Sequence, residues 1–259
     1  MKVVILAGGL GTRLMEETES RPKPMVEIGG KPILWHIMKI YEHYGYSEFI
    51  ICLGYKAHMI KEYFLNYYLY SSDVTIELDK NKIDVHYSET ESFKVTLVDT
   101  GISTNTAGRL KKIEKYVAGE TFMLTYGDGV ANVNLTALLD YHIKHQKLVT
   151  LTSVQAPGRF GSIEINEEGN VDNFVEKPQG DGMWINGGFF VLEPGIFNYL
   201  LEDDINNTQW EKGPLQKIAK DKQLSAFKHN GFWKPMDALR DRIELESLWN
   251  NGLAKWKVW

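Results

Sequence analysis

A glycine-rich segment near the start of the chain contains the first residues whose types and spacing suggest chemistry. Gly8, Gly9 and Gly11 follow the apolar run KVVIL, and Thr12 and Arg13 come next. Glycines let backbone amides approach an oxyanion closely, and a guanidinium offers a planar fork for two phosphate oxygens. The segment therefore predicts a loop that binds phosphate, with a triphosphate as a suitable ligand, at the end of a strand.

Two common nucleotide-binding signatures do not fit this loop. In a P-loop, Gly-Lys is followed by Ser or Thr, but the run GGKP places Pro32 where the Mg²⁺-binding hydroxyl would stand. The dinucleotide signature G-x-G-x-x-G also fails, because its last glycine position, counted from Gly9, holds Leu14. Neither a P-loop enzyme nor a dehydrogenase is expected.

A lysine between two prolines is the second candidate binding residue. Pro22 and Pro24 fix their own φ angles and bias the residues before them away from helix. Lys23 is therefore held in a stiff segment of the run RPKP. This favours a lysine directed at a ligand over a solvated one.

Two aspartates in loop contexts are candidate ligands of a hard cation. Asp128 lies between two glycines after the run FMLTY, and Asp237 follows FWKPM near an expected helix start. Mg²⁺ prefers oxygen ligands and often takes one or two carboxylates together with substrate phosphates. The residues alone leave two alternatives open, since a turn explains Asp128 and a helix N-cap explains Asp237 equally well.

The expected elements place these residues at the ends of strands. Short apolar runs at residues 2–9, 48–54, 95–101, 121–129 and 149–155 alternate with helical patterns at 31–45, 56–68, 107–117 and 135–146. This alternation predicts an α/β fold with a doubly wound sheet, which binds ligands beyond the carboxyl ends of its strands. Residues 73–88 and 160–178 break the alternation and predict accessory β-hairpins. No linker divides the chain, so we expect one domain over residues 1–259.

Charge and composition exclude several classes of protein. The 259 residues carry a formal net charge of −5, whereas binding to nucleic acid or anionic membrane needs a basic surface. The single cysteine, Cys52, lies in an apolar run and is expected to be buried. No apolar run approaches the roughly 18 to 20 residues of a membrane helix. We expect a cytoplasmic protein without nucleic-acid or membrane partners.

A longer series of motifs carries a resemblance. The segments LAGGLGTRL and RPKPMVEIGGKPIL are followed in order by DTG, TAGRLKK, TYGDGV, PGRFG, FVEKP, INGGFFV and FWKPMD. Over essentially the whole chain this series resembles the sugar-1-phosphate nucleotidyltransferase family, and within it the glucose-1-phosphate cytidylyltransferases. The resemblance implies a Rossmann-like fold with a mixed, mainly parallel sheet. It also implies Mg²⁺-dependent reaction of CTP with glucose 1-phosphate, which gives CDP-glucose and pyrophosphate.

The resemblance further implies roles for individual residues. Arg13, Lys23 and Lys177 are the expected catalytic cations, and Asp128 and Asp237 the expected metal ligands. Arg109 matches the family's cytosine-reading position, and its guanidinium donors suit the acceptors N3 and O2 of that base. The expected nucleotide site comprises Leu6, Ala7, Gly8, Gly9, Leu10, Gly11, Thr12, Arg13, Lys23, Thr104, Gly108, Arg109 and Gly127, and the sugar-phosphate site comprises Glu176, Lys177, Asn186 and Gly187.

Several alternatives stay open. On chemistry alone, Arg109 also fits a surface position at a helix start, and Glu176 with Lys177 fits a solvated pair at a hairpin end. A thymidylyl- or uridylyltransferase on the same scaffold, or a non-catalytic nucleotide-sugar sensor, is the alternative to cytidylyl transfer. The resemblance implies a homo-oligomer, with a hexamer as one candidate, that serves the synthesis of bacterial surface polysaccharide such as O-antigen.

Overall fold

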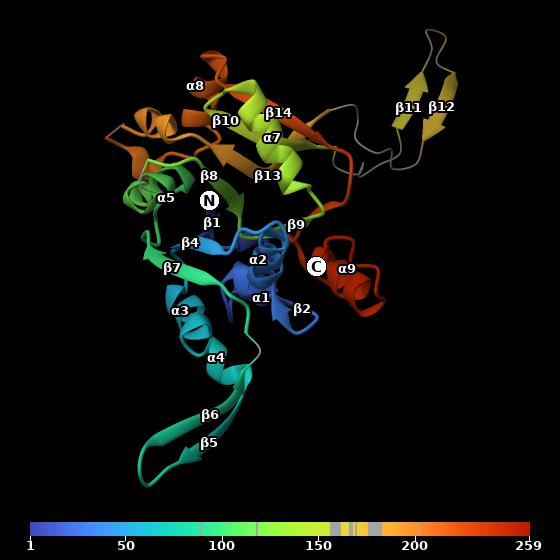
Figure 1. The fold of residues 1–259 in the computed structure, drawn as a ribbon. Coiled ribbons are helices and arrows are strands. Elements are labelled where there is room, and N and C mark those ends of the chain that lie inside the picture. The colour runs from blue at the N-terminus through green and yellow to red at the C-terminus, as the bar shows by residue number, and fades with distance from the viewer. Residues whose placement is uncertain are drawn as a thin grey trace.

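A seven-stranded sheet forms the centre of the computed structural model, which describes residues 1–88, 90–117, 119–155, 162–165, 168, 170–175, 183–201 and 203–259 (Figure 1). In spatial order its strands are β14 (Leu224–His229), β10 (Val149–Val154), β13 (Ile185–Leu192), β8 (Phe122–Tyr126), β1 (Lys2–Leu6), β4 (Glu48–Leu53) and β7 (Lys94–Asp99). All of these run parallel except β13, which is antiparallel to both of its neighbours. The expected mixed, mainly parallel sheet is confirmed.

Helices cover both faces of this sheet. Val3 and Ile5 belong to one cluster of buried side chains, whereas Val4 and Leu6 belong to another. Successive side chains of a strand point to opposite faces, so the two clusters lie on the two faces. The first cluster packs under α2 (Ile33–His43), α3 (Ala57–Leu65), α7 (Leu135–His145) and α9 (Leu239–Asn250), and the second under α5 (Thr106–Lys112), α6 (Glu114–Val117) and α8 (Pro214–Lys220). The expected doubly wound arrangement is therefore confirmed.

Short elements connect these strands and helices. They are η1 (Thr12–Leu14), α1 (Met15–Thr18), η2 (Lys23–Met25), β2 (Glu27–Ile28), β3 (Lys31–Pro32), α4 (Tyr67–Tyr70), β9 (Gly129–Ala131), η3 (Pro194–Tyr199), η4 (Ile205–Asn207) and β15 (Trp233–Pro235). The helix expected over 56–68 ends at Leu65, because Asn66 leaves helical geometry and its side chain bonds the Glu62 carbonyl oxygen. Within the parts of the chain described, no helix has the length and apolar character needed to cross a membrane.

The reversed direction of β13 matters for the position of its first residues. Phe189 pairs with Thr125 and Leu192 with Phe122, so β13 begins where β8 ends. The segment from Asn186 to Gly188 therefore lies at the carboxyl end of β8, beside the loop that follows β1. A strand start thus joins the sheet edge at which a doubly wound fold binds its ligands.

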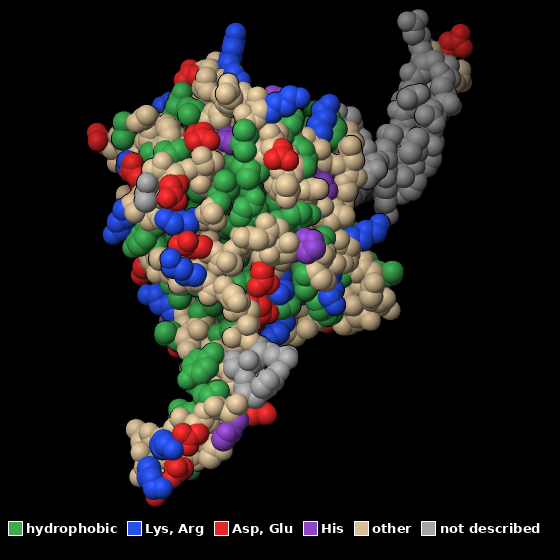
Figure 2. All heavy atoms as spheres, in the orientation of Figure 1, with side chains coloured by type: hydrophobic (Ala, Val, Ile, Leu, Met, Phe, Trp, Pro, Cys, Tyr) green, Lys and Arg blue, Asp and Glu red, His purple; other side chains and the backbone are tan. Residues whose placement is uncertain are grey.

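Both expected hairpins are present. Strands β5 (Ser72–Glu77) and β6 (Lys82–Ser88) pair and project away from the main sheet (Figure 1). Figure 2 shows positive and negative side chains gathered toward the tip of this β5–β6 hairpin. There Lys82 Nζ lies 2.6 Å from Asp84 Oδ2. Strands β11 (Ser162–Ile165) and β12 (Val171–Val175) form the described part of the second hairpin.

A cluster of tryptophans encloses one histidine of α2. The His36 ring contacts Trp35, Trp249, Trp256 and Trp259, with ring centroids 4.8 to 6.2 Å apart. Trp256 is fully buried, so it covers the core rather than facing solvent. The Nε2–H of His36 donates to the Ile28 carbonyl oxygen at 2.8 Å, and its Nδ1 accepts from Trp256 Nε1 at 3.4 Å. Burial lowers the pKa of His36 to about 4, which keeps this imidazole neutral.

Acidification is expected to destabilise the fold through His36. The unfolded chain binds a proton at this site near pH 6.5, whereas the folded chain does so only near pH 4, so stability is lost as pH falls between these values. We expect a loss of about 2 kcal/mol in unfolding free energy between pH 7 and pH 5 from this group. Urea denaturation at both pH values should show a smaller loss in His36→Gln than in the wild type. The exposed His58→Gln serves as control, and equal losses in His36→Gln and the wild type would contradict the assignment.

Candidate active site

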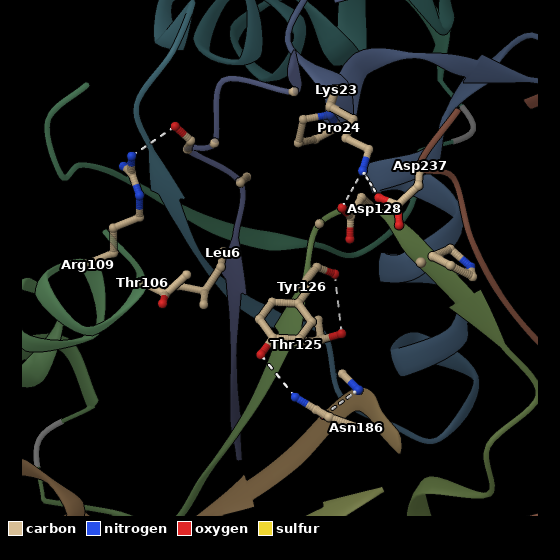
Figure 3. Close-up of a pocket in the computed structure, with 18 of the residues that line it drawn as sticks. Leu6, Lys23, Pro24, Thr106, Arg109, Thr125, Tyr126, Asp128, Asn186 and Asp237 are labelled. Atoms are coloured by element: carbon tan, nitrogen blue, oxygen red, sulfur yellow. Dashed lines mark hydrogen bonds and ion pairs between the residues drawn. The ribbon is translucent and has the colours of Figure 1, made fainter. Parts of the chain in front are cut away.

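A cavity of about 510 Å³ opens at the carboxyl ends of β1 and β8 (Figure 3). Its walls come from the loop after β1, from η2, from the start of α5, from the turn between β8 and β9, from the start of β13 and from the segment that precedes α9. These segments are far apart in the chain and meet at one edge of the sheet. The cavity therefore stands where the fold predicts ligand binding.

The glycine-rich loop forms one wall of this cavity. Gly11 has a φ of +67°, and a Cβ there would lie 2.7 Å from Thr18 Cγ2, so both backbone geometry and space require glycine. The Thr18 hydroxyl donates to the Gly11 carbonyl oxygen at 3.1 Å and fixes the turn. Of the loop residues expected to bind nucleotide, Leu10 is exposed and does not line the cavity, whereas Leu6, Ala7, Gly8, Gly9, Gly11, Thr12 and Arg13 do.

Arg109 is buried, lines the cavity and braces the glycine-rich loop. Its guanidinium donates to the carbonyl oxygens of Leu53 and Gly8, each at 2.9 Å, and to the Thr100 hydroxyl at 2.6 Å. A Cβ on Gly8 would lie 2.1 Å from Arg109 Nη1, so the guanidinium occupies the space that a larger residue would take. Burial lowers the pKa of this group. Arg109 is thus no surface residue, and its contact with a cytosine base stays a prediction.

A short strand pair brings the two predicted metal ligands together. β9 pairs antiparallel with β15, with Gly129 opposite Pro235, so the residues flanking this pair lie side by side. Asp128 precedes β9 and Asp237 follows β15 by two residues. Two carboxylates that are 109 positions apart in the sequence therefore face the same point of the cavity (Figure 3).

Lys23 lies between these two carboxylates. Its ammonium donates to Asp128 Oδ2 at 2.6 Å and to Asp237 Oδ1 at 2.8 Å. Arg13 reaches Asp237 Oδ2 at 3.3 Å. Only 11% of the Lys23 side chain is exposed; burial by itself lowers its pKa, but the two carboxylates outweigh burial and the pKa lies above its usual value. Lys23 is therefore a charged, aligned ammonium, and neither aspartate serves only as a turn or cap residue.

The donor set around Lys23 fits a hard divalent cation. Both aspartates direct a carboxylate oxygen at the Lys23 ammonium, so the same pair lies close enough to share a cation, and oxygen is the ligand that Mg²⁺ prefers. No group of three or more His, Cys, Asp and Glu that could hold a metal occurs among the residues described. A metal ion here would accordingly take two protein ligands, and phosphates and water would complete its shell. His142, by contrast, is buried and bonds Glu193 and Thr150, so it has a packing role.

Asn186 lines the opposite side of the cavity. Its Oδ1 accepts from the Gly188 amide at 2.9 Å, and its Nδ2 donates to the Tyr126 hydroxyl at 3.2 Å (Figure 3). Gly187 also lines the cavity, and its carbonyl oxygen accepts from Trp233 Nε1 at 2.7 Å. Glu176 and Lys177, the other two residues expected to hold the sugar phosphate, lie outside the described residues.

The remaining predicted nucleotide residues divide into two groups. Thr104 and Gly127 line the cavity. Gly108 does not; a Cβ there would lie 2.7 Å from Asn206 Cα, so glycine is required because η4 packs against α5. This packing gives position 108 a structural reason for glycine, and its contact with a base stays a prediction.

The cavity lining also includes residues that were not among the predicted site residues. Thr106 lies at the start of α5, Tyr126 ends β8, and Trp233 and Pro235 belong to β15. All four lie within motifs of the resemblance: Thr106 in TAGRLKK, Tyr126 in TYGDGV, and Trp233 with Pro235 in FWKPMD. Position at the end of a strand was the signal that could have found Tyr126.

Comparison with known proteins shows the family of the chain. The family model for nucleotidyl transferases matches residues 2–247. A glucose-1-phosphate cytidylyltransferase of Salmonella typhi is 56% identical over the whole of both chains. A probable glucose-1-phosphate cytidylyltransferase of Bacillus subtilis is 46% identical, again over the whole of both chains.

Solved structures share the fold. HddC from Yersinia pseudotuberculosis superposes with a TM-score of 0.67 at 26% identity, over 96% of this chain and 99% of that one. A UDP-glucose pyrophosphorylase complexed with UDP-glucose gives a TM-score of 0.69 at 18% identity, over 97% of this chain and 98% of that one. By its sequence from residue 2 to residue 247 and by its fold, the chain belongs to the nucleotidyl transferase family.

Proposed function

We propose that this chain transfers a cytidylyl group from CTP to glucose 1-phosphate, with formation of CDP-glucose and release of pyrophosphate. The observation that carries the proposal is the 56% identity to a glucose-1-phosphate cytidylyltransferase over the full length of both chains. The convergence of Arg13, Lys23, Asp128 and Asp237 at one cavity supports it. A phosphate oxygen of glucose 1-phosphate attacks the α-phosphorus of CTP, and the bond from that phosphorus to the β-phosphate oxygen breaks.

The residues of the cavity suit a reaction that needs positioning rather than a base. A sugar phosphate has a second pKa near 6 and is already mostly a dianion at pH 7, so its oxygen attacks without losing a proton to the protein. The loop amides and Arg13 bind the triphosphate of CTP, and Lys23 lies on the side of the two aspartates. These groups bring two anions that repel each other into line, which is the main task in this kind of transfer.

Asp128 and Asp237 would hold Mg²⁺, and the bound ion would offset negative charge on the phosphate oxygens. On the far side of the cavity, Asn186 contacts the sugar. Lys177 and Glu176, which lie outside the described residues, are proposed to bind the sugar phosphate as well. Arg109 reads the cytosine base, next to the loop that it braces. We also propose that the chain forms a homo-oligomer, with a hexamer as one candidate. Residues 1–259 form a single domain in this proposal.

A substrate panel tests the proposal. Release of pyrophosphate is measured with glucose 1-phosphate and each of CTP, UTP, dTTP, GTP and ATP, with Mg²⁺ or with EDTA. We expect CTP to give the highest kcat/KM, and EDTA to abolish turnover. Preference for UTP or dTTP would contradict the cytidylyl assignment, and binding without turnover in every case would favour a nucleotide-sugar sensor. Galactose 1-phosphate and mannose 1-phosphate serve as sugar controls.

A further inference from the structure

One carboxylate outside the cavity lining binds two cavity residues, one with each of its oxygens. Glu211 lies between η4 and α8 and is not among the residues that line the cavity. Its Oε1 accepts from the Tyr126 hydroxyl at 2.5 Å, and its Oε2 accepts from the Thr106 hydroxyl at 3.0 Å. Tyr126 stands beside Asn186 on the sugar side, and Thr106 begins the helix that carries Arg109. Glu211 therefore connects the two halves of the site.

The carboxylate fixes the direction of each hydrogen bond on the sugar side. A carboxylate only accepts, so the single hydroxyl proton of Tyr126 points at Glu211. Burial and the charge of Glu211 raise the pKa of Tyr126, so the proton stays on the phenol. The Tyr126 oxygen must then accept from Asn186, which turns the Asn186 amide nitrogen toward Tyr126 and its Oδ1 toward the Gly188 amide. The second N–H of that amide is left to donate to a ligand.

The other oxygen of Glu211 helps to fix the start of α5. The Thr106 hydroxyl donates to Glu211 and accepts from the Trp210 amide at 2.7 Å. Nearby, the amides of Asn105 and Ala107 donate to the carbonyl oxygens of Asn206 and Thr208, at 2.7 and 3.2 Å. The segment from Asn206 to Glu211 thus holds the first turn of the helix that lines the nucleotide side.

We propose that Glu211 is a positioning residue that sets the donor direction of Asn186 through Tyr126 and so makes Asn186 a hydrogen-bond donor to glucose 1-phosphate. The proposal rests on the function proposed above, because it assigns the sugar phosphate to the side of Asn186. Glu211 itself touches no substrate. Its effect reaches the sugar side through a chain of two hydrogen bonds, both of which the structure contains.

Glu211→Gln keeps the size of the side chain and tests whether Glu211 sets the direction of the two hydrogen bonds. A glutamine has one acceptor oxygen and one NH₂ group, so only one of the two hydroxyls keeps its acceptor; with the NH₂ toward Tyr126, the phenol proton loses its fixed direction. We expect the KM for glucose 1-phosphate to rise roughly tenfold, the effect of one misdirected hydrogen bond. The KM for CTP should change much less. Tyr126→Phe removes the same link at another point and should give the same split, and it keeps the test valid if Glu211→Gln folds poorly.

A double variant separates positioning from general damage. In an Asn186→Ala background, Glu211→Gln should cause no further rise in the KM for glucose 1-phosphate, because the group it orients is gone. Glu193→Gln is the matched control, since Glu193 also accepts from two groups, Thr121 and His142, but lies outside the cavity lining. Equal rises in both KM values, or a full additional rise in the Asn186→Ala background, would overturn the proposal.

Failure of the proposed function is recognised separately. If the wild type turns over with CTP and glucose 1-phosphate, unchanged KM values in Glu211→Gln and Tyr126→Phe refute the positioning role alone. If none of the nucleotides supports turnover by the wild type, the Kd of glucose 1-phosphate is measured by calorimetry for the wild type and the same variants. The same tenfold weakening is then expected, and its absence refutes the positioning role.

Discussion

Lys23→Ala should lower kcat/KM for nucleotidyl transfer on the order of 100- to 1,000-fold, the usual cost of removing one aligned charged donor from such a site. The expected size of the effect follows from the geometry of Lys23, which is nearly buried and held by two carboxylates at 2.6 and 2.8 Å. No side chain elsewhere in the described cavity can take its place, because Arg13 approaches Asp237 from the other oxygen. Initial rates of pyrophosphate release measure the effect.

The control for this variant is Lys144→Ala, which removes an exposed lysine of α7. Thermal denaturation of both variants shows whether the fold is retained. If Lys23→Ala folds and turns over at the wild-type rate, the proposed role of Lys23 is refuted.

Asp128→Asn and Asp237→Asn should each lower the rate on the order of 100- to 1,000-fold and raise the Mg²⁺ concentration needed for half-maximal rate. Asparagine keeps the shape of aspartate but lacks its charge, so it binds a divalent cation less strongly. Because both aspartates face one point, their effects should not add, and the double variant should be little worse than the poorer single one.

Rates measured over a series of Mg²⁺ concentrations distinguish this role from loss of folding. Asp140→Asn, an exposed aspartate of α7, is the matched control and should leave the Mg²⁺ dependence unchanged. Full additivity of the two single effects, with unchanged Mg²⁺ dependence, would show that the aspartates act at separate points.

Much of the fold follows from local patterns. The runs around β1 and β4 are apolar and rich in β-branched residues because both faces of a parallel sheet are covered, and such runs predict buried strands directly. The direction of β13 could not be predicted. A buried strand has the same composition whether it runs parallel or antiparallel, and its direction depends on the whole path of the chain.

The candidate site, like the fold, could be predicted from the sequence only in part. Arg13 and Lys23 lie in two short motifs near the start of the chain, and their presence at a ligand site could be inferred from the local glycines of one and the prolines of the other. The approach of Asp128 to Asp237 depends on the three-residue pairing of β9 with β15, a contact between distant segments that leaves no periodic signal. Glu211 belongs to no motif at all, and only the folded chain shows what it touches. Sequence chemistry likewise indicated a donor at Arg109 but not that its donors face backbone carbonyl oxygens.

The position of β1 in the sheet has a consequence for biosynthesis. β1 lies between β4 and β8, so its second edge finds its partner only after residue 126 has been made. At roughly 5 to 20 residues per second, a ribosome needs on the order of ten seconds to make that stretch. Throughout this interval an apolar strand with an unpaired edge is open to association with other nascent chains. The second edge of β1 is therefore protected by pairing only once β8 has been made.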